Sequence, residues 1–301
     1  VQARNVFALV GVLGTDNNLA AQSFLAQQKV PLIMPLTGSS AVIRPLRKYV
    51  FTYEPAYTVE ARVLTDYAVK TLHAQKIAVF YQNDNFGKEG LNATIAEIQK
   101  LGKARYVAAT SYSLLDIDMS AQVQKIQQSG ADTVIMFAVP PSAGLFLRAA
   151  ATTGLQVKYL STSVGGDPAV LKALGAAGNG IYFADWLPDW ARAKQTALYR
   201  SILTTYGTPQ TTPIGPVTEG GVVAAQILVE GLKRAGKNLT RDGLVKALES
   251  IHNWNGGIAS NVSYSATKHD GPEGVYVSVS QNAQQNPSLM PVTPYTYPTY
   301  P

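Results

Sequence analysis

The sequence predicts an α/β fold built of two doubly wound, Rossmann-like lobes with parallel sheets, and three observations indicate it. At 301 residues the chain is longer than one ordinary compact core and suits two lobes. Short apolar runs alternate with helical stretches through its first part, as in sheets that are covered by helices on both faces. After Trp186 this rhythm changes, and helices follow one another with only short strands between them.

Five short apolar runs are predicted to be buried strands. Each run is continuous rather than alternating, which is typical of parallel strands buried on both faces. The runs are Asn5–Val12, Pro31–Leu36, Lys76–Tyr81, Asp132–Ala138 and Val157–Ser161. They supply the inner layer of the predicted fold.

Helices are predicted between these strands. One covers Tyr57–His73, a second opens with an asparagine cap at Asn85 and ends before Gly102, and a third covers Met119–Ser129 and ends at Gly130. The later part adds Arg192–Tyr206, Glu219–Ala235 and Arg241–Ile251. Residues 256–290 resemble a hairpin with a final strand at Gly274–Ser280, and the tail from Gln281 is expected to be an irregular surface strap.

The composition excludes several classes of function. The net charge is +6, but the basic residues are scattered singly, without the stripe and interleaved aromatics that nucleic-acid binding requires. The absence of cysteine removes disulfides, thiol catalysis and thiolate metal sites. No apolar run reaches the roughly 18 residues of a membrane span. We therefore expect no nucleic-acid partner and no direct membrane insertion.

No group of residues indicates catalysis or a cofactor. The histidines His73, His252 and His269 lack the spacing of a metal site, and the GxSxG pattern of a serine nucleophile is absent. Gly231–Lys237 (GLKRAGK) resembles a phosphate-binding loop, but it lies at the end of a helix and lacks the Ser or Thr after the lysine. Gly236 is interpreted as a helix terminator. We expect a protein that is not an enzyme and holds no cofactor or metal.

Small polar residues follow two of the predicted strands. Thr15 and Asn17 come after Val12, and the run Thr37-Gly38-Ser39-Ser40 comes after Leu36. Ligands of open α/β sheets bind beyond the carboxyl ends of strands, where helix N-termini offer free N–H groups to an anion. The same residues are also ordinary turn and cap formers, so both interpretations stay open at this point.

Five stretches, in order along the chain, resemble the type I solute-binding proteins of the branched-chain amino acid transport group. They read VFALVGVLGTDNNLAA, VPLIMPLTGSS, KIAVFYQNDNFGKEGL, GGVVAAQILVEGLKRAGKNLTRDGLVKALESI and KHDGPEGVYVSV. The resemblance covers residues 5 to 280. It implies a first lobe of residues 1–56 and 187–257 and a second of 57–186 and 258–301. Three hinge crossovers would join the lobes, with the ligand in the cleft between them.

The resemblance also implies positions for ligand contacts. Thr15 stands where a hydroxyl holds the ligand carboxylate, and Asn17 lies in the same loop. Thr37, Gly38 and Ser39 occupy the second strand-end loop, which supplies N–H and hydroxyl contacts. In the second lobe, an aromatic residue that covers the ligand corresponds to Phe86, and Val139 falls in another contact strip.

One departure from the family's pattern concerns the charge opposite a ligand ammonium. Amino-acid binders place an acidic residue in the loop that corresponds to residues 161–165, but this chain has Ser163 and its neighbours there, without an acid. An unpaired buried ammonium is costly, so the loop favours solutes that lack one, unless Asp185 or Glu219 substitutes.

The resemblance implies an exported binding protein, periplasmic or at the cell surface, that delivers a small carboxylate-bearing solute (an amino acid, an aliphatic acid or an aromatic acid) to the permease subunits of an ABC importer. A cytoplasmic ligand sensor of the same fold that controls a regulator is the alternative. A second departure is the lack, before Asn5, of the strand, helix and strand with which the family begins. We therefore expect the strand Asn5–Val12 to need a further partner, and the site residues named above to be a subset.

Overall fold

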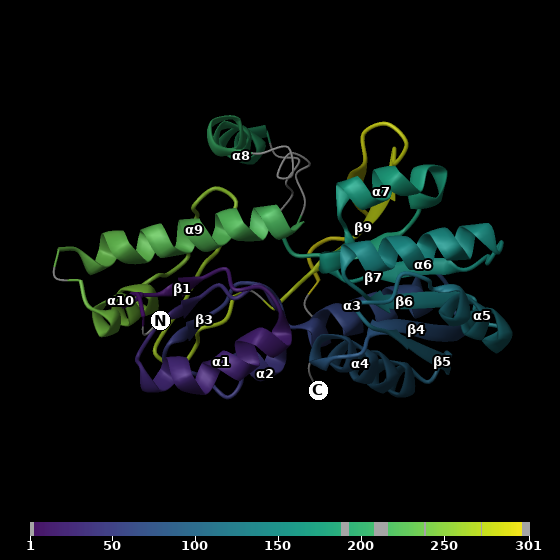
Figure 1. The fold of residues 1–301 in the computed structure, drawn as a ribbon, viewed down its shortest axis with the longest axis horizontal. Coiled ribbons are helices and arrows are strands. Elements are labelled where there is room, and N and C mark those ends of the chain that lie inside the picture. The colour runs from purple at the N-terminus through teal and green to yellow at the C-terminus, as the bar shows by residue number, and fades with distance from the viewer. Residues whose placement is uncertain (1–2, 188–192, 208–215, 238, 272, 297–301) are drawn as a thin grey trace. The chain divides into compact units, whose positions relative to one another are not determined.

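The computed structural model describes residues 3–187, 193–207, 216–237, 239–271 and 273–296. The chain divides into two compact units and passes between them three times (Figure 1). Unit 1 consists of Val1–Ala56 and Leu187–Glu273, and unit 2 of Tyr57–Trp186 and Gly274–Pro301. The first two crossings fall at the two lobe boundaries expected from the sequence.

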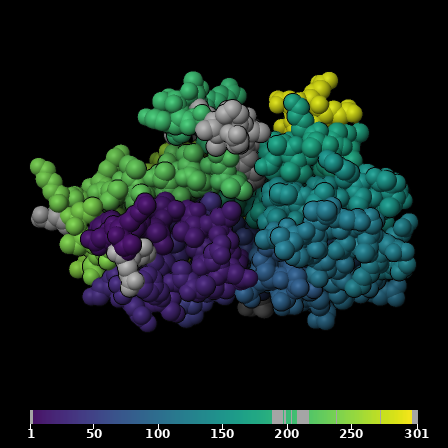
Figure 2. Space-filling view, in the orientation of Figure 1, coloured from purple at the N-terminus to yellow at the C-terminus, as the bar shows by residue number. Residues whose placement is uncertain are grey.

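Unit 1 contains a three-stranded parallel sheet between two layers of helices. Its strands, in spatial order, are β1 (Leu9–Val10), β2 (Leu32–Ile33) and β3 (Val50–Phe51). Its helices are α1 (Thr15–Gln27), α2 (Ser40–Ile43), α8 (Ala193–Tyr206), α9 (Pro216–Ala235) and α10 (Arg241–Glu249). Helices α1 and α2 lie on one face of the sheet, and α9 and α10 on the other (Figure 1). In the space-filling view the N-terminal and the later green segments accordingly share one surface (Figure 2).

The strands of unit 1 are shorter than the apolar runs suggest. Gly11, which follows β1, has a left-handed backbone conformation with φ 64°. Met34, which follows β2, has one with φ 48°. Each interrupts the extended conformation that a ladder needs. Strand β1 pairs only with β2 among the described residues, and Val10 is 37% exposed. The expectation that a further segment covers this edge stays a prediction.

Unit 2 is a seven-stranded sheet with helices on both faces. In spatial order its strands are β10 (Ser288–Pro291), β9 (Tyr276–Gln281), β8 (Tyr182–Asp185), β7 (Lys158–Ser161), β6 (Thr133–Phe137), β4 (Lys76–Gln82) and β5 (Arg105–Tyr112). Its helices are α3 (Tyr57–Lys70), α4 (Asn85–Leu101), α5 (Ser120–Ser129), α6 (Pro140–Thr152) and α7 (Pro168–Leu174), with short 3₁₀ turns η1 (Ser163–Gly165) and η2 (Gly175–Gly178). Strands β4 to β8 run parallel, and β8–β9–β10 pair antiparallel.

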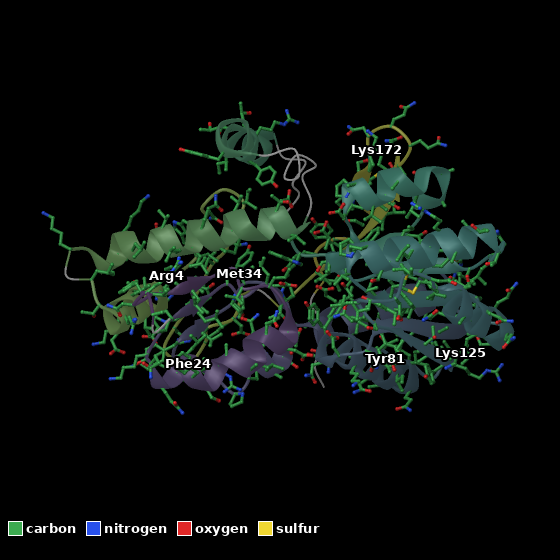
Figure 3. All side chains as sticks on the ribbon, viewed as in Figure 1. Arg4, Phe24, Met34, Tyr81, Lys125 and Lys172 are labelled. Atoms are coloured by element: carbon green, nitrogen blue, oxygen red, sulfur yellow. The ribbon has the colours of Figure 1, made fainter. Side chains whose placement is uncertain are left out.

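The two faces of the unit 2 sheet are covered by different helices. Helices α3 and α4 pack together on one face, and α5, α6 and α7 follow one another on the other. Apolar side chains fill the space under both layers (Figure 3), including Phe80, Phe146 and Phe183 on the α5–α7 side. The predicted α/β class with parallel sheets is confirmed, with an antiparallel edge added.

The ends of the predicted helices show how local residues fix them. Helix α4 is capped by Asp84, whose side chain accepts from the Gly87 N–H at 3.0 Å, and not by Asn85 as expected. Gly102 and Gly130 end α4 and α5 in the left-handed conformation, as predicted. Helix α8 begins at Ala193, and Arg192, where the sequence places its start, lies outside the described residues.

Two sequence-based assignments near the C-terminus are wrong. Residues 258–273, assigned to the second lobe, pack within unit 1, where the Tyr264 hydroxyl donates to the Thr52 carbonyl and the His269 ring stacks on Phe51 at 3.9 Å. The tail beyond Gln281 is not only an irregular strap. It turns back to form β10, because β9 has an edge that can accept a partner.

Candidate functional site

Two strand-end loops of unit 1 meet at a pair of threonine hydroxyls. The β1–α1 and β2–α2 loops are held side by side by backbone bonds from Gly14 N to Leu36 O (3.2 Å) and from Leu36 N to Val12 O (3.0 Å). Thr15, the first residue of α1, and Thr37 are both buried, and their Oγ1 atoms lie 2.8 Å apart. The structure thus brings together the two hydroxyls that the sequence analysis singled out separately.

The neighbours of Thr37 complete this polar group. Gly38 and Ser39 are buried, and the Ser39 N–H donates to Thr37 Oγ1 at 3.2 Å. Ser39 precedes α2 and makes no side-chain cap to it, and Gly14, which precedes α1, has no side chain to cap with. The positive ends of α1 and of the α2 turn therefore begin beside the two hydroxyls.

Asn17 does not join this group. It is exposed, and its amide donates back to the Leu13 carbonyl at 3.1 Å, which closes the β1–α1 turn. The next residue, Asn18, is buried instead and donates to Val12 O at 2.8 Å and Gly14 O at 2.6 Å. Within the residues that the structure describes, its buried Oδ1 has no hydrogen-bond partner. Asn18 is therefore the amide that supports the loop.

Glu219 lies buried in the first turn of α9. Its neighbour Gly220 packs on the segment that follows β2. An added Cβ there would approach Leu36 Cδ2 at 2.9 Å. Burial and the nearby charge of Glu219 raise the pKa of Tyr199 to about 12. Glu219 thus belongs to unit 1, whereas Ser163 belongs to unit 2.

In unit 2, Phe86 lies buried in an aromatic cluster at the carboxyl end of the sheet. Its ring centroid is 4.7 Å from that of Tyr57 and 6.1 Å from that of Phe137. Asp84 caps α4 two residues before Phe86. Gly90 lets the helix lie against β6, since an added Cβ would overlap the Phe137 ring at 2.1 Å. The helix start therefore fixes the position of Phe86.

Val139 lies half-buried after β6 and is tied to β5. Its N–H donates to Tyr112 Oη at 3.0 Å, and the same hydroxyl donates to Gln82 Oε1 at 2.9 Å. Burial raises the pKa of Tyr112 to about 12, so this hydroxyl stays protonated near neutral pH. The chain of bonds holds together the carboxyl ends of β4, β5 and β6.

Ser163 follows β7 and is held by a carboxyl group from another element. Its N–H donates to Glu60 Oε2 at 3.0 Å and its Oγ to Glu60 Oε1 at 2.8 Å. Glu60 lies in the first turn of α3 and is fully buried. Burial raises the pKa of Glu60 to about 8 against the opposing effect of the Ser163 bonds, and the charge of Asp185, buried at the end of β8, raises it slightly further.

Glu60 is the site residue that the sequence analysis missed. The loop after β7 carries no acid of its own, as expected, but α3 brings one to it. A signal was present, because Glu60 stands between Val59 and Ala61 and three residues before Val63, within the apolar stretch of the predicted helix. A charged residue on a face that is otherwise buried is unusual and indicates a specific partner.

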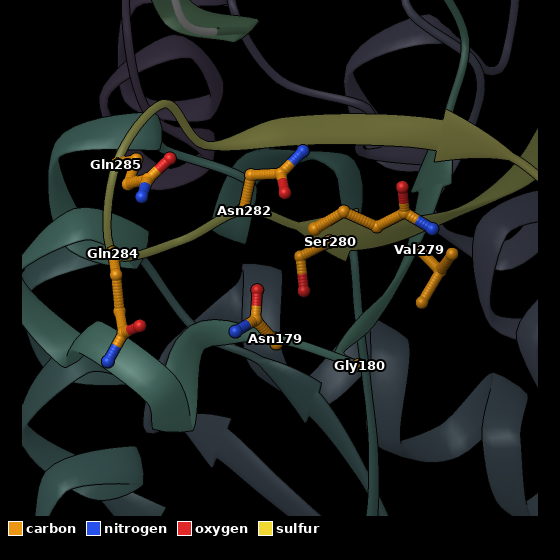
Figure 4. Close-up of a pocket in the computed structure, with 8 residues that line it drawn as sticks. Asn179, Gly180, Val279, Ser280, Asn282, Gln284 and Gln285 are labelled. Atoms are coloured by element: carbon orange, nitrogen blue, oxygen red, sulfur yellow. The ribbon is translucent and has the colours of Figure 1, made fainter.

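Two cavities of unit 2 lie away from these residues. A cavity of about 550 Å³ opens beside the start of β8 and the β9–β10 turn and is lined mainly by amide side chains, among them Asn179, Asn282 and Gln285 (Figure 4). A second, of about 310 Å³, lies between α3, α4 and β9 and includes Arg62 and Glu97. Neither contains a residue of the strand-end groups described above.

The described residues include no metal-binding cluster and no membrane-spanning helix. They contain no cluster of three or more His, Cys, Asp or Glu side chains placed to hold a metal ion. Among the helices that the structure describes, none combines the length and the apolar character needed to cross a bilayer.

Comparison with known sequences identifies relatives of one kind. Residues 1–285 match the family described as periplasmic binding protein. The chain is 34% identical over 99 residues to an amino acid binding protein of Pseudomonas aeruginosa, a match to 33% of this chain and 26% of that protein. It is 25% identical over 246 residues to Leu/Ile/Val-binding protein homolog 3 of Brucella melitensis, a match to 80% of this chain and 64% of that protein. The matches thus span less than two thirds of each relative's length.

Solved structures with the same fold bind different small molecules. A branched-chain amino acid ABC transporter protein of Thermus thermophilus with bound valine has a TM-score of 0.86 and 21% identity, covering 95% of this chain and 77% of that one. A solute-binding protein of R. palustris in complex with benzoate has a TM-score of 0.83 and 20% identity, covering 99% and 80%. A fatty acid ABC transporter substrate-binding protein of Thermomonospora curvata has a TM-score of 0.83 and 20% identity, covering 98% and 76%.

Proposed function

Since this chain belongs to the periplasmic binding protein family, we propose that it captures a small carboxylate-bearing solute outside the cytoplasm and delivers it to an ABC importer. Valine, benzoate and a fatty acid, named with three proteins of the same fold, share one chemical group, a carboxylate. We therefore propose that the solute carries a carboxylate. We further propose that the solute contacts residues of both units.

The hydroxyl pair in unit 1 is the proposed anchor for that carboxylate. Thr37 Oγ1 accepts from the Ser39 N–H, so it can give its own proton to Thr15 Oγ1. The Thr15 proton then remains available to a solute oxygen. Charge-assisted bonds of this kind are about twice as strong as neutral ones, and the nearby start of α1 adds to the attraction.

The single observation that carries the choice of solute class is the contact between Glu60 and Ser163. Both carboxyl oxygens already accept hydrogen bonds from Ser163, and burial raises the pKa of the group to about 8, which favours its neutral form at pH 7. It therefore offers no free anion to an ammonium group. We propose a solute without an α-ammonium, on the premise that Asp185 and Glu219 do not pair with one either, since an unpaired ammonium in a buried site is costly.

The apolar part of the solute is proposed to meet the aromatic cluster of unit 2. Phe86 and Tyr57 pack on one another at the carboxyl end of the sheet, and the half-buried Val139 lies at the same end. Aromatic acids and branched aliphatic acids match such a lining, because the burial of apolar area drives their binding.

The test is a calorimetric comparison of matched acid and amino-acid pairs. The pairs are 4-methylpentanoate with leucine, and 3-phenylpropanoate with phenylalanine, each differing only in the α-ammonium. We expect one of the acids to bind at least tenfold more tightly than its amino-acid partner, and the amide of that acid to bind worse than the acid. Micromolar binding of leucine, isoleucine or valine would contradict the proposed class. Turnover of any solute in the same mixtures would contradict a binding role.

A further inference from the structure

The loop that follows the edge strand β5 exposes three large aliphatic side chains. Leu114 is 64% exposed, Leu115 is 89% exposed and Ile117 is 86% exposed. Single apolar residues are common on protein surfaces, but three exposed ones within four positions form a cluster of the kind that marks an interaction site. We call residues 113–118 the aliphatic loop.

The aliphatic loop is held in one shape by hydrogen bonds. The Ser113 N–H donates to Asp116 Oδ2 at 2.8 Å, and the Asp116 N–H donates to the Ser113 carbonyl at 3.0 Å. Asp118 Oδ1 accepts from the Ser120 N–H at 2.9 Å and from Ser120 Oγ at 2.6 Å. Because the backbone is already ordered, the aliphatic side chains are presented at a low entropic cost of binding.

Two carboxylates accompany the apolar side chains. Asp116 lies between Leu115 and Ile117, and Asp118 follows at once. The side-chain and backbone bonds from Ser120 hold the pKa of Asp118 below its usual value, so this group is anionic at neutral pH. The loop therefore combines an exposed apolar surface with negative charge, on a chain whose net charge is +6.

We propose that the aliphatic loop docks into an apolar hollow with a lysine- or arginine-rich rim on a partner protein. The negative charges of the aliphatic loop indicate which kind of partner binds it. In a two-fold contact between two copies the same patch would face itself, and the carboxylates of both copies would be brought together. A lipid surface would have to take up Asp116 between two inserted side chains, which is unfavourable for a carboxylate. A basic rim pairs with both aspartates while the hollow receives the aliphatic groups.

The identity of the partner rests on the proposed function, whereas the docking surface does not. For a solute-binding protein of an importer, the partner is a membrane subunit of that importer. None of the aliphatic-loop side chains belongs to the strand-end contacts of the solute site. Solute binding and docking can therefore be measured separately.

The experiment places a photocrosslinking amino acid, p-benzoylphenylalanine, at Leu115 in the full chain, in living cells of the organism that makes it. The matched control carries the same group at Lys103, an exposed residue before the other end of β5. We expect Leu115 to crosslink to a peptide of a membrane-spanning subunit, identified by mass spectrometry, and the control position not to do so. The crosslink should weaken at least tenfold in Asp116→Asn/Asp118→Asn and in the Ile117→Ser variant.

Other outcomes would overturn the inference. They are crosslinks to a second copy, to lipid or to another part of the same chain, and a yield no higher than that of the Lys103 control. As a second measurement, Leu115→Ser/Ile117→Ser should reduce solute uptake at least tenfold and leave solute affinity unchanged, and unchanged uptake would also overturn it. A solute panel without any binding would instead contradict the proposed function and leave the crosslinking result standing.

Discussion

The backbone N–H and the hydroxyl of Ser163 both donate to the carboxyl group of Glu60, a buried side chain more than a hundred residues earlier in the chain. This contact joins the start of α3 to the end of β7. It also places a proton inside the protein, because burial raises the pKa of Glu60 to about 8. The protonation state of one residue is thus coupled to the loop that follows β7.

Replacing Glu60 should change how the stability of the protein depends on pH. The unfolded carboxyl titrates near 4.5 and the folded one near 8, so between these values only the unfolded chain loses its proton as the pH rises. Each pH unit in that window removes up to about 1.4 kcal/mol of stability, and no more is lost to this group above pH 8. Urea unfolding from pH 5 to 8 should show a flatter profile for Glu60→Gln. Glu89→Gln, on α4, is the control and should keep the wild-type slope, and equal slopes for both variants would contradict the assignment.

Calorimetry should detect no proton release when the solute binds. A solute without an ammonium leaves Glu60 neutral, so the binding enthalpy at pH 7 should be the same in phosphate and in Tris, which differ in ionisation enthalpy. An ammonium solute would require an ionised Glu60, and its binding would release close to one proton. A buffer-dependent enthalpy that disappears in Glu60→Gln would point to an amino acid after all.

Removing the Thr15 hydroxyl should weaken solute binding by about tenfold or more, since a charge-assisted hydrogen bond is worth roughly 1.5–3 kcal/mol. Thr15→Val keeps the shape and removes the donor, whereas Thr15→Ser keeps the hydroxyl and serves as the control. The melting temperature of Thr15→Val should fall only slightly, because Thr37 Oγ1 loses a single partner. Equal affinity in Thr15→Val and wild type would exclude the proposed anchor.

Two glycine-to-alanine changes should have opposite effects on stability. A Cβ at Gly87 would lie 2.1 Å from the Gln82 carbonyl oxygen, so Gly87→Ala must push α4 away from β4 and destabilise the protein by several kcal/mol, on the order of a severe core substitution. At Gly221, in α9, nothing lies within 4 Å, and Gly221→Ala should stabilise by about 0.5–1 kcal/mol through helix propensity. Denaturation midpoints test both, and a stable Gly87→Ala variant would refute the close approach.

Small-angle scattering should show a smaller radius of gyration when the solute is bound. A solute that contacts both units favours, by its differential contacts, the arrangement in which the units are closest. An unchanged radius at a solute concentration that saturates calorimetry would argue against the proposal that both units bind it.

The sequence predicts the fold well where apolar runs are long, and less well where a single residue interrupts them. Strands β4, β6 and β7 agree with the predicted runs within about two residues at each end, because nothing in those runs forces a different backbone. The run Asn5–Val12 gives only the two residues of β1, since Gly11 takes a left-handed conformation that periodicity does not reveal. Residues 258–273 were assigned to the wrong unit, because contacts such as that of His269 with Phe51 leave no pattern in the sequence.

The candidate site could be predicted in its local parts only. Thr15 and Thr37 lie beyond strand ends, where the topology of parallel sheets places ligand contacts, and the structure brings their hydroxyls together. The contact between Glu60 and Ser163 joins elements that are far apart in the chain, and it requires the packing of α3 against the sheet to be known. Asn17 and Asn18 could not be distinguished by type, because only the turn of α1 decides which amide is buried.

The three passages of the chain between the units determine the order in which the protein can assemble during synthesis. The sheet of unit 1 is made first, but α9 and α10, which cover one of its faces, leave the ribosome only after strands β4 to β8 of unit 2. Strand β9 follows later still, and Ala283 and Leu289 complete the unit 2 core. The unit 1 core cannot close before α10 has been made, nor the unit 2 core before β9, so the growing chain stays incompletely folded while the earlier elements are synthesised.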